Sequence, residues 1–240
     1  MNSFSSEVFA ESRQFILVTT GGWGAVDGEM RLYERESVKD RWNAVDEKIP
    51  VVIGRNGMAW GQGLHGGAVG GGPVKQEGDG RSPAGVFRLS SAFGYEPPEQ
   101  AGDVKLPYVQ AVGTLECVDD PQSAHYNRIV DRARLENPDW KSSERMWRDD
   151  DQYRRGVVID HNAECAPGRG SCVFMHIWEA PGKGTAGCTA MSLSSMERLL
   201  RRLDAGKKPL LVQLPQPEFE RLREALGLTM PIFELKLPTY

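Results

Sequence analysis

The residues best suited to chemistry lie between Phe174 and Met191, where His176 precedes Cys188 by twelve positions. A cysteine attacks a carbonyl only as its thiolate, and a nearby helix N-terminus lowers the pKa of the thiol. Cys188 comes shortly before a predicted helix, and His176 lies on a predicted strand. A strand–loop–helix connection can bring the two side chains together, which is the arrangement that acyl transfer uses. The spacing alone fits a buried structural cysteine as well.

The segment around Cys188 is also suited to holding an oxyanion. Gly187 lets a substrate carbonyl approach the backbone closely, because glycine has no side chain. We expect backbone N–H groups near Gly187 and Cys188 to stabilise the negative charge. Thr189 is a further candidate in this loop, and the hydroxyl of Thr185 is a candidate to shape it.

Two more side chains are candidates for the same cleft. His161 follows a predicted strand and lies fifteen residues before His176. It either lines the cleft or forms hydrogen bonds at the end of its strand. Trp178 either forms an apolar wall of the cleft or packs in the core.

Metal and nucleotide sites fit the sequence poorly. Cys165 and Cys172 are too far apart for a structural zinc knuckle, whose cysteines are usually separated by two to four residues. The run Gly61–Gly66 matches a dinucleotide-binding motif, but the glycines and Pro73 that follow cannot propagate the helix that such a site needs. We therefore expect a loop there and no metal or organic cofactor.

The elements that must position these residues are mostly short strands closed by turn residues. Strands are predicted at 15–18, 30–33, 49–54, 85–89, 157–160, 171–177, 209–214 and 233–237, with a turn at 81–83. Ser194 and Glu197 form a predicted capping box at the start of a helix, and Gly206 is expected at its end. A second short helix is predicted over 218–226.

The segment 131–156 is highly charged yet carries Trp140, Trp147 and Tyr153. We interpret it as a partly helical excursion over the surface, which either covers a cleft or forms a solvated face.

Composition excludes several classes of protein. With 240 residues, 40% hydrophobic and 26% charged, the chain is a globular protein of one β-rich α+β domain. A net charge of −4 provides no basic surface for nucleic acid, and no apolar run is long enough to span a membrane. The first fourteen residues lack the charged and apolar regions of a signal peptide.

Two segments resemble the YkuD-type L,D-transpeptidases. The segment 78–88, Gly-Asp-Gly-Arg-Ser-Pro-Ala-Gly-Val-Phe-Arg, is similar to that family's GDGxTPxGxY/F motif. Phe174-Met-His176 and Thr185-Ala-Gly-Cys188 are similar to its active-site signature. The two motifs lie about a hundred residues apart in the order that the family shows, and the resemblance extends from about Phe15 to Leu214.

The resemblance implies a β-sandwich-like catalytic core with a few short helices, formed by residues 15–215. Residues 1–14 are then an N-terminal extension, and 216–240 a C-terminal helix and strand packed on the same domain. The implied activity is cross-linking of peptidoglycan stem peptides, which serve as donor and acceptor, through a thioester on Cys188. His176 takes the thiol proton or pairs with the thiolate. No cofactor is required, and the implied location is the periplasm or cell envelope.

Two departures from the family leave alternatives open. Ala186 stands where many members have histidine, and Ala190 where many have arginine. Water in place of an amine would make the chain an L,D-carboxypeptidase or another peptidoglycan amidase, and loss of turnover would leave a non-catalytic wall-binding module. In an oxidising compartment Cys117 can pair with Cys165 or Cys172, whereas Cys188 must stay free.

Overall fold

The computed structural model describes residues 5–228. Its strands are β1 (Gln14–Thr20), β2 (Asp27–Glu34), β3 (Asn43–Ala44), β4 (Ile49–Val52), β5 (Met58–Trp60), β6 (Ser82–Gly94), β7 (Tyr108–Gln110), β8 (Leu115–Val118), β9 (Ile129–Asp131), β10 (Ser143–Arg145), β11 (Arg155–Ile159), β12 (Phe174–Ile177), β13 (Thr189–Met191) and β14 (Leu210–Pro215). Its helices are α1 (Leu193–Arg202) and α2 (Gln216–Leu222), with short 3-10 turns η1 (Ser6–Phe9), η2 (Pro98–Gln100), η3 (Arg132–Arg134) and η4 (Ala205–Lys207). The expectation of a mainly β fold with few helices is confirmed.

The main sheet closes on itself. Its strands follow the order β1-β14-β6-β11-β12-β13-β4-β2, and β2 then pairs with β1 along its whole length. Eight strands therefore form a barrel, with β1 parallel to β14 and β12 parallel to β13. The expected sandwich is not confirmed, because the β1–β2 pairing joins what would have been two free edges.

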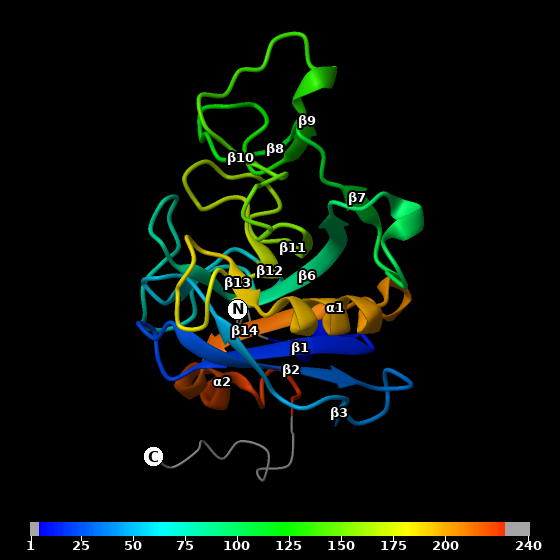
Figure 1. Cartoon of the computed structure of the whole chain (residues 1–240). Helices are drawn as coiled ribbons and strands as arrows, with labels where there is room; N and C mark the ends of the chain where they lie inside the picture. Colours follow the sequence, from blue (N-terminus) through cyan, green and yellow to red (C-terminus); the bar gives the residue numbers. More distant parts are fainter. Residues whose placement is uncertain (1–4, 229–240) are drawn as a thin grey trace.

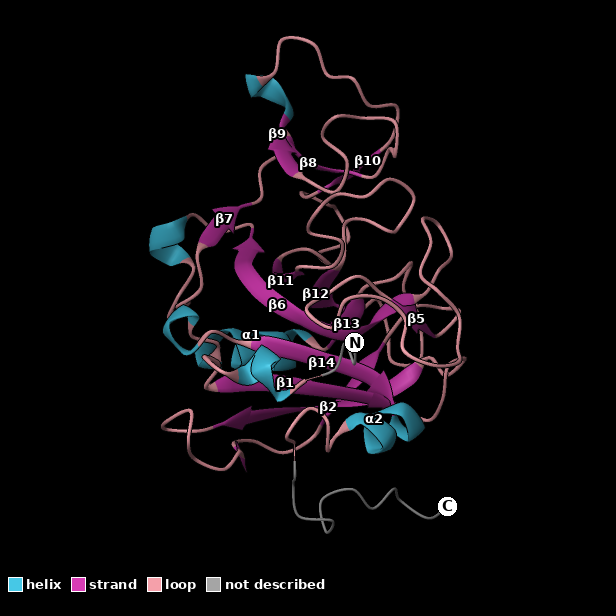
Figure 2. Ribbon diagram, turned by 180° about the vertical axis from the view of Figure 1, so that it is seen from behind, coloured by secondary structure: helices cyan, strands magenta, loops and turns pink. Residues whose placement is uncertain are grey.

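Apolar side chains of the strands and of both helices form one buried core. Figures 1 and 2 show α1 and α2 beside the strands of the barrel. The run Phe15–Val18 is buried throughout, which a continuous apolar run predicts for a strand covered on both faces. Phe9, before the first strand, belongs to the same core, and so do Phe219 and Leu222 of α2.

A separate lobe rises from one end of the barrel. Residues 95–154 connect β6 to β11 and carry the small antiparallel sheet β10-β8-β9, which lies above β11 and β12 in Figure 1. The helical character expected for 131–156 is limited to the three residues of η3; the rest is loop, the strand β10 and the adjoining ends of β9 and β11. Trp140 and Tyr153 are buried, whereas Trp147 is exposed and stacks on Tyr95.

A second apolar cluster joins the lobe to the barrel. It consists of Phe93, Ala111, Leu115, Cys117, Met146, Tyr153, Cys172, Phe174 and Cys188. Cys117 and Cys172 form a disulfide within it, which decides the pairing that the sequence left open. Cys165 and Cys188 are free thiols.

Several predicted boundaries differ from the structure. The N-cap of α1 is Ser192, whose hydroxyl accepts the Ser195 N–H at 3.2 Å, so the predicted cap Ser194 lies inside the helix. Leu203 is the C-cap, and Gly206 belongs to η4 instead of ending α1. The local sequence would allow either Ser192 or Ser194 to cap the helix. The position of β13 determines which of the two serines becomes the N-cap.

Other differences concern strand ends. The predicted turn at 81–83 is wrong in part, because Ser82 and Pro83 already belong to β6 and pair with β5. The predicted strand at 171–177 begins only at Phe174, since Cys172 has a left-handed backbone with φ of 53°. α2 covers 216–222 and passes into a turn that ends near Gly227. The strand expected at 233–237 lies outside the described residues.

Candidate active site around Cys188

The loop before β13 is held by the hydroxyl of Thr185. This hydroxyl donates a hydrogen bond to the carbonyl of Cys188 at 2.6 Å and accepts one from the Gly187 N–H at 3.1 Å. One side chain therefore fixes both ends of the Gly187–Cys188 peptide. It also occupies the Gly187 N–H, which was expected to serve the oxyanion.

The segment 78–88, which leads into β6, contacts this loop. The Ser82 hydroxyl donates to the carbonyl of Cys188 at 3.1 Å and accepts the Gly54 N–H at 2.9 Å. A side chain at position 187 would place its Cβ 3.1 Å from the Arg81 carbonyl oxygen, so only glycine fits without a shift. The two motifs that lie far apart in the sequence thus meet at Cys188.

The aspartate of that segment organises its turn. Asp79 accepts the N–H groups of Gln76 and Arg81 at 2.9 Å each and forms a 2.5 Å ion pair with Lys75, which is buried. The Lys75 charge in turn lowers the pKa of the Cys188 thiol, although it is one of the smaller influences. The turn therefore supplies a buried cation to the surroundings of the sulfur.

Cys188 is buried, and only 6% of the residue is exposed. Its sulfur accepts the Phe174 N–H at 3.3 Å and lies 3.6 Å from the Cys172 carbonyl, to which it donates. Burial, followed by the negative charge of Glu144, raises the thiol pKa to about 12, against the lowering effect of the Phe174 N–H and Tyr153. The thiol is therefore neutral at pH 7. The predicted help from the helix N-terminus is absent, because β13 separates Cys188 from the start of α1.

His176 lies on β12, beside the strand that follows Cys188, in register with Ala190. Its Nδ1 is 2.8 Å from the Ile177 carbonyl oxygen, which can only accept, so Nδ1 carries the proton and Nε2 has a free lone pair. Burial lowers the pKa of His176 to about 4, which keeps the ring neutral at pH 7. Within residues 5–228 no hydrogen bond joins this ring to Cys188.

Tyr153 links the two residues. Its ring meets the His176 ring edge to face at 5.1 Å, and it belongs to the same buried cluster as Cys188, whose pKa it helps to lower. The same hydroxyl donates to Glu144 Oε2 at 2.6 Å, and the Arg148 guanidinium lies 5.0 Å from the ring centre. Sequence reasoning missed Glu144 and Arg148, because nothing in a charged surface segment indicates which of its members turns inward.

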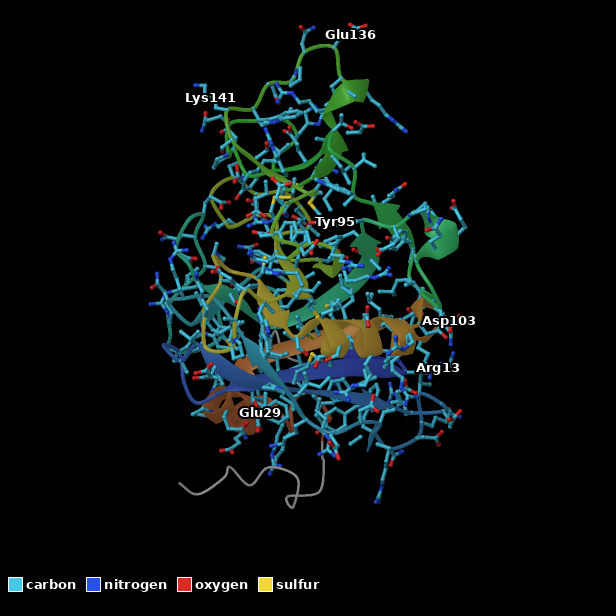
Figure 3. The ribbon with its side chains drawn as sticks, in the orientation of Figure 1. Arg13, Glu29, Tyr95, Asp103, Glu136 and Lys141 are labelled. Carbon is cyan, nitrogen blue, oxygen red and sulfur yellow. A yellow bond between two sulfur atoms is a disulfide. The ribbon has the colours of Figure 1, made fainter. Side chains whose placement is uncertain are left out.

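Tyr153, Glu144 and Arg148 lie in the lobe and in the connection that leads from it back to β11. Figure 3 shows Tyr95 where the lobe meets the barrel, while Glu136 and Lys141 lie at its far end. The buried disulfide Cys117–Cys172 fastens β8 of the lobe to the residue two positions before β12. The lobe therefore covers Cys188, as one of the two interpretations of the charged segment requires.

The remaining candidates are used elsewhere. His161 accepts the Gln62 N–H through Nδ1 at 3.2 Å and donates from Nε2 to the Arg169 carbonyl at 2.9 Å, so both ring nitrogens hold loops. The Thr189 hydroxyl donates to Gln213 Oε1 at 2.6 Å inside the barrel. Trp178 is half-buried, and its backbone N–H donates a hydrogen bond to the Met191 carbonyl.

The described part of the chain contains no group of three or more metal-ligating side chains placed to hold an ion. No helix within residues 5–228 is long and apolar enough to cross a membrane.

Comparison with known proteins gives a distant structural likeness. No family profile matches the chain, and no curated protein matches it. The crystal structure of the helical cell shape determining protein Pgp2 from Campylobacter jejuni aligns with it at a TM-score of 0.38 and 13% sequence identity. The alignment covers 89% of this chain and 56% of that chain, so this chain spans little more than half of that protein's length.

Proposed function

We propose that this chain is a cysteine-dependent acyltransferase of the cell wall, an L,D-transpeptidase that joins peptidoglycan stem peptides. The observation that carries the proposal is the hydrogen bond from the Ser82 hydroxyl to the Cys188 carbonyl. The bond joins the two segments that resemble the YkuD-type family, and the residue at which they meet is a free cysteine. Residues 15–215 form the catalytic domain in this proposal, and the site of action is the periplasm or cell envelope.

In the proposed reaction His176 takes the proton of the Cys188 thiol, and the thiolate attacks the carbonyl that joins the third stem residue, a diamino acid, to D-Ala. The C–N bond breaks, D-Ala leaves as an amine after gaining that proton from His176, and a thioester remains on Cys188. An amine of a neighbouring stem then attacks the thioester, which forms the cross-link and releases the thiol. His176 has a free Nε2 lone pair, so it is the base that takes the proton from this incoming amine.

A binding module without turnover is the second candidate, and one observation favours it. The thiol is buried and neutral, with a pKa of about 12, whereas an active nucleophile needs access and thiolate character. Such a module would bind muropeptide and form no thioester.

Mass spectrometry of the protein with a disaccharide-tetrapeptide, with and without a free D-amino acid, separates these outcomes. We expect exchange of the terminal D-Ala or dimer formation, and complete loss of both in Cys188→Ala. The matched control is Cys165→Ala, which removes the other free thiol and keeps activity. Tripeptide alone would indicate an L,D-carboxypeptidase. Full activity of Cys188→Ala would contradict the proposal.

A further inference from the structure

An exposed aromatic pair lies where the lobe joins the barrel. Trp147 is 45% exposed and is the largest apolar side chain that the described residues present to solvent. Its ring stacks on that of Tyr95, with the ring centres 4.5 Å apart and the planes inclined by 28°. A large aromatic face that is left open to water commonly marks a binding site.

Hydrogen bonds hold this aromatic pair in place. The Tyr95 hydroxyl donates to the Arg148 carbonyl at 2.9 Å and accepts the Arg148 N–H at 3.0 Å, so it fixes the backbone of the residue that follows Trp147. The Gln110 side chain donates to the Tyr95 carbonyl at 3.1 Å. The Trp147 face is therefore presented in one orientation, and a ligand that stacks on it does not have to order it first.

The aromatic pair forms an apolar wall of a hollow of about 430 Å³. The hollow is lined by Tyr95, Glu96, Trp147, Arg148, Asp149, Asp151 and Arg154. Glu96 and Arg154 form an ion pair at 3.5 Å. Asp149 and Asp151 are exposed, and within residues 5–228 no hydrogen bond or ion pair occupies their carboxylates. The hollow thus combines an apolar wall with hydrogen-bond acceptors that are free to bind a ligand.

A sugar ring matches this combination better than a protein or a nucleic acid does. One face of a pyranose consists of C–H groups that pack on an aromatic ring, while its hydroxyls point outward and donate hydrogen bonds to carboxylates. Apart from the aromatic pair, the five lining residues are all charged, so this hollow lacks the apolar neighbours that surround the anchor of a protein interface. Three of the five are acidic, which disfavours the phosphates of a nucleic acid.

We propose that this hollow is a glycan-binding subsite, in which an N-acetylated amino sugar of the substrate's glycan strand stacks on Trp147. The proposal rests on the proposed function for the identity of that strand. The hollow is linked to the candidate active site through Arg148, whose guanidinium lies 5.0 Å from the centre of the Tyr153 ring. That ring meets the His176 ring at 5.1 Å. Three extended residues span about 10 Å, so a stem peptide that begins at a sugar in the hollow is long enough to bring the bond after its third residue toward His176.

The test is isothermal titration calorimetry with chitotetraose, the neutral tetramer of N-acetylglucosamine. Binding needs no thioester, so Trp147-dependent binding without turnover would support the subsite and contradict only the proposed transpeptidase. We expect Trp147→Ala to bind about tenfold more weakly, a loss typical of removing one aromatic stacking partner, and Trp147→Tyr to keep most of the affinity. Asp149→Asn is expected to bind more weakly as well, and it decides the matter if Trp147→Ala does not fold.

The matched control is Val38→Ala, for which we expect the affinity of the parent. It shortens another exposed apolar side chain, in the connection between β2 and β3 at the end of the molecule away from the lobe (Figure 1). In turnover, we expect Trp147→Ala to raise the KM of a disaccharide-tetrapeptide about tenfold and to leave that of the sugar-free tetrapeptide unchanged.

Two results would overturn the subsite. One is the absence of chitotetraose binding in the parent, or unchanged binding in both Trp147→Ala and Asp149→Asn. The other is self-association of the parent in analytical ultracentrifugation that Trp147→Ala abolishes, because the aromatic pair is then a contact between protein molecules. Turnover of stem peptides in the absence of glycan binding would overturn the subsite alone and leave the proposed function standing.

Discussion

At the scale of single residues, the candidate site consists of a reactive group that its surroundings hold in the neutral form. The Cys188 thiol is buried and its pKa is raised further by the charge of Glu144, and burial lowers the pKa of His176, so both are uncharged at pH 7. Chemistry at this site therefore begins with a proton transfer and does not start from a preformed thiolate–imidazolium pair.

Thr185 is the residue whose removal tests the loop geometry most directly. Thr185→Val keeps the shape of the side chain and loses both hydrogen bonds of the hydroxyl, so we expect a loss of about 1–3 kcal/mol in the free energy of unfolding. We also expect thioester formation to fall, because the Gly187–Cys188 peptide is no longer fixed. Denaturant unfolding and intact-protein mass spectrometry measure the two effects.

Thr185→Ser is the control for that change. It keeps the hydroxyl, and we expect stability and reactivity close to those of the parent. If Thr185→Val and Thr185→Ser have the same stability and the same thioester formation, the hydroxyl does not hold the loop.

At the scale of elements, the order of β12, β13 and α1 determines what surrounds Cys188. Because β13 must pair with both β12 and β4, it occupies three residues that the local sequence would allow to become helix or loop. The helix therefore begins at Leu193, too late for its N-terminus to act on the thiol.

The position of the cap gives a matched pair of variants. Ser192→Ala removes the hydroxyl that accepts the Ser195 N–H, so we expect a loss of about 1 kcal/mol in the free energy of unfolding. Ser194 is exposed in the first turn, and alanine there is expected to be neutral within a few tenths of a kcal/mol. Urea unfolding of both variants measures the difference. A larger loss for Ser194→Ala would place the cap where the sequence pattern alone predicts it.

At the scale of the whole molecule, the closed barrel and the lobe bury three histidines. Burial lowers the pKa of His65, His161 and His176 to about 4 each, against an ordinary value of 6.5. Below pH 6.5 the unfolded chain binds protons that the folded chain does not. Their contribution to stability is therefore complete above pH 6.5 and is lost as the pH falls toward 4. The raised pKa values of Glu144 and Asp160 act in the opposite sense.

We expect each buried histidine to account for a loss of about 3 kcal/mol in the free energy of unfolding between pH 6.5 and 4. His161→Gln removes one of these groups. We therefore expect its free energy of unfolding to change with pH with a smaller slope in that range, by an amount that corresponds to one proton. Urea unfolding at a series of pH values measures the slope. Parallel curves for parent and variant would contradict the assignment.

The sequence by itself determined the local features of this protein. Apolar runs and turn residues predict most strands of the barrel, because a strand that is buried on both faces needs continuous apolar side chains. The motif around Cys188 and the segment 78–88 could be identified as partners from their resemblance to one family, and Thr185 could be named as a candidate to shape the loop because it belongs to that motif.

Only the tertiary structure decided the rest. Closure of the barrel depends on the pairing of β1 with β2 and β14, and strand pairing across a chain leaves no local pattern. The disulfide partner of Cys117 and the contacts of Tyr153 with Glu144 and His176 depend on how a charged lobe folds back over the barrel. The neutral state of the thiol has the same origin, because burial is a property of the assembled molecule.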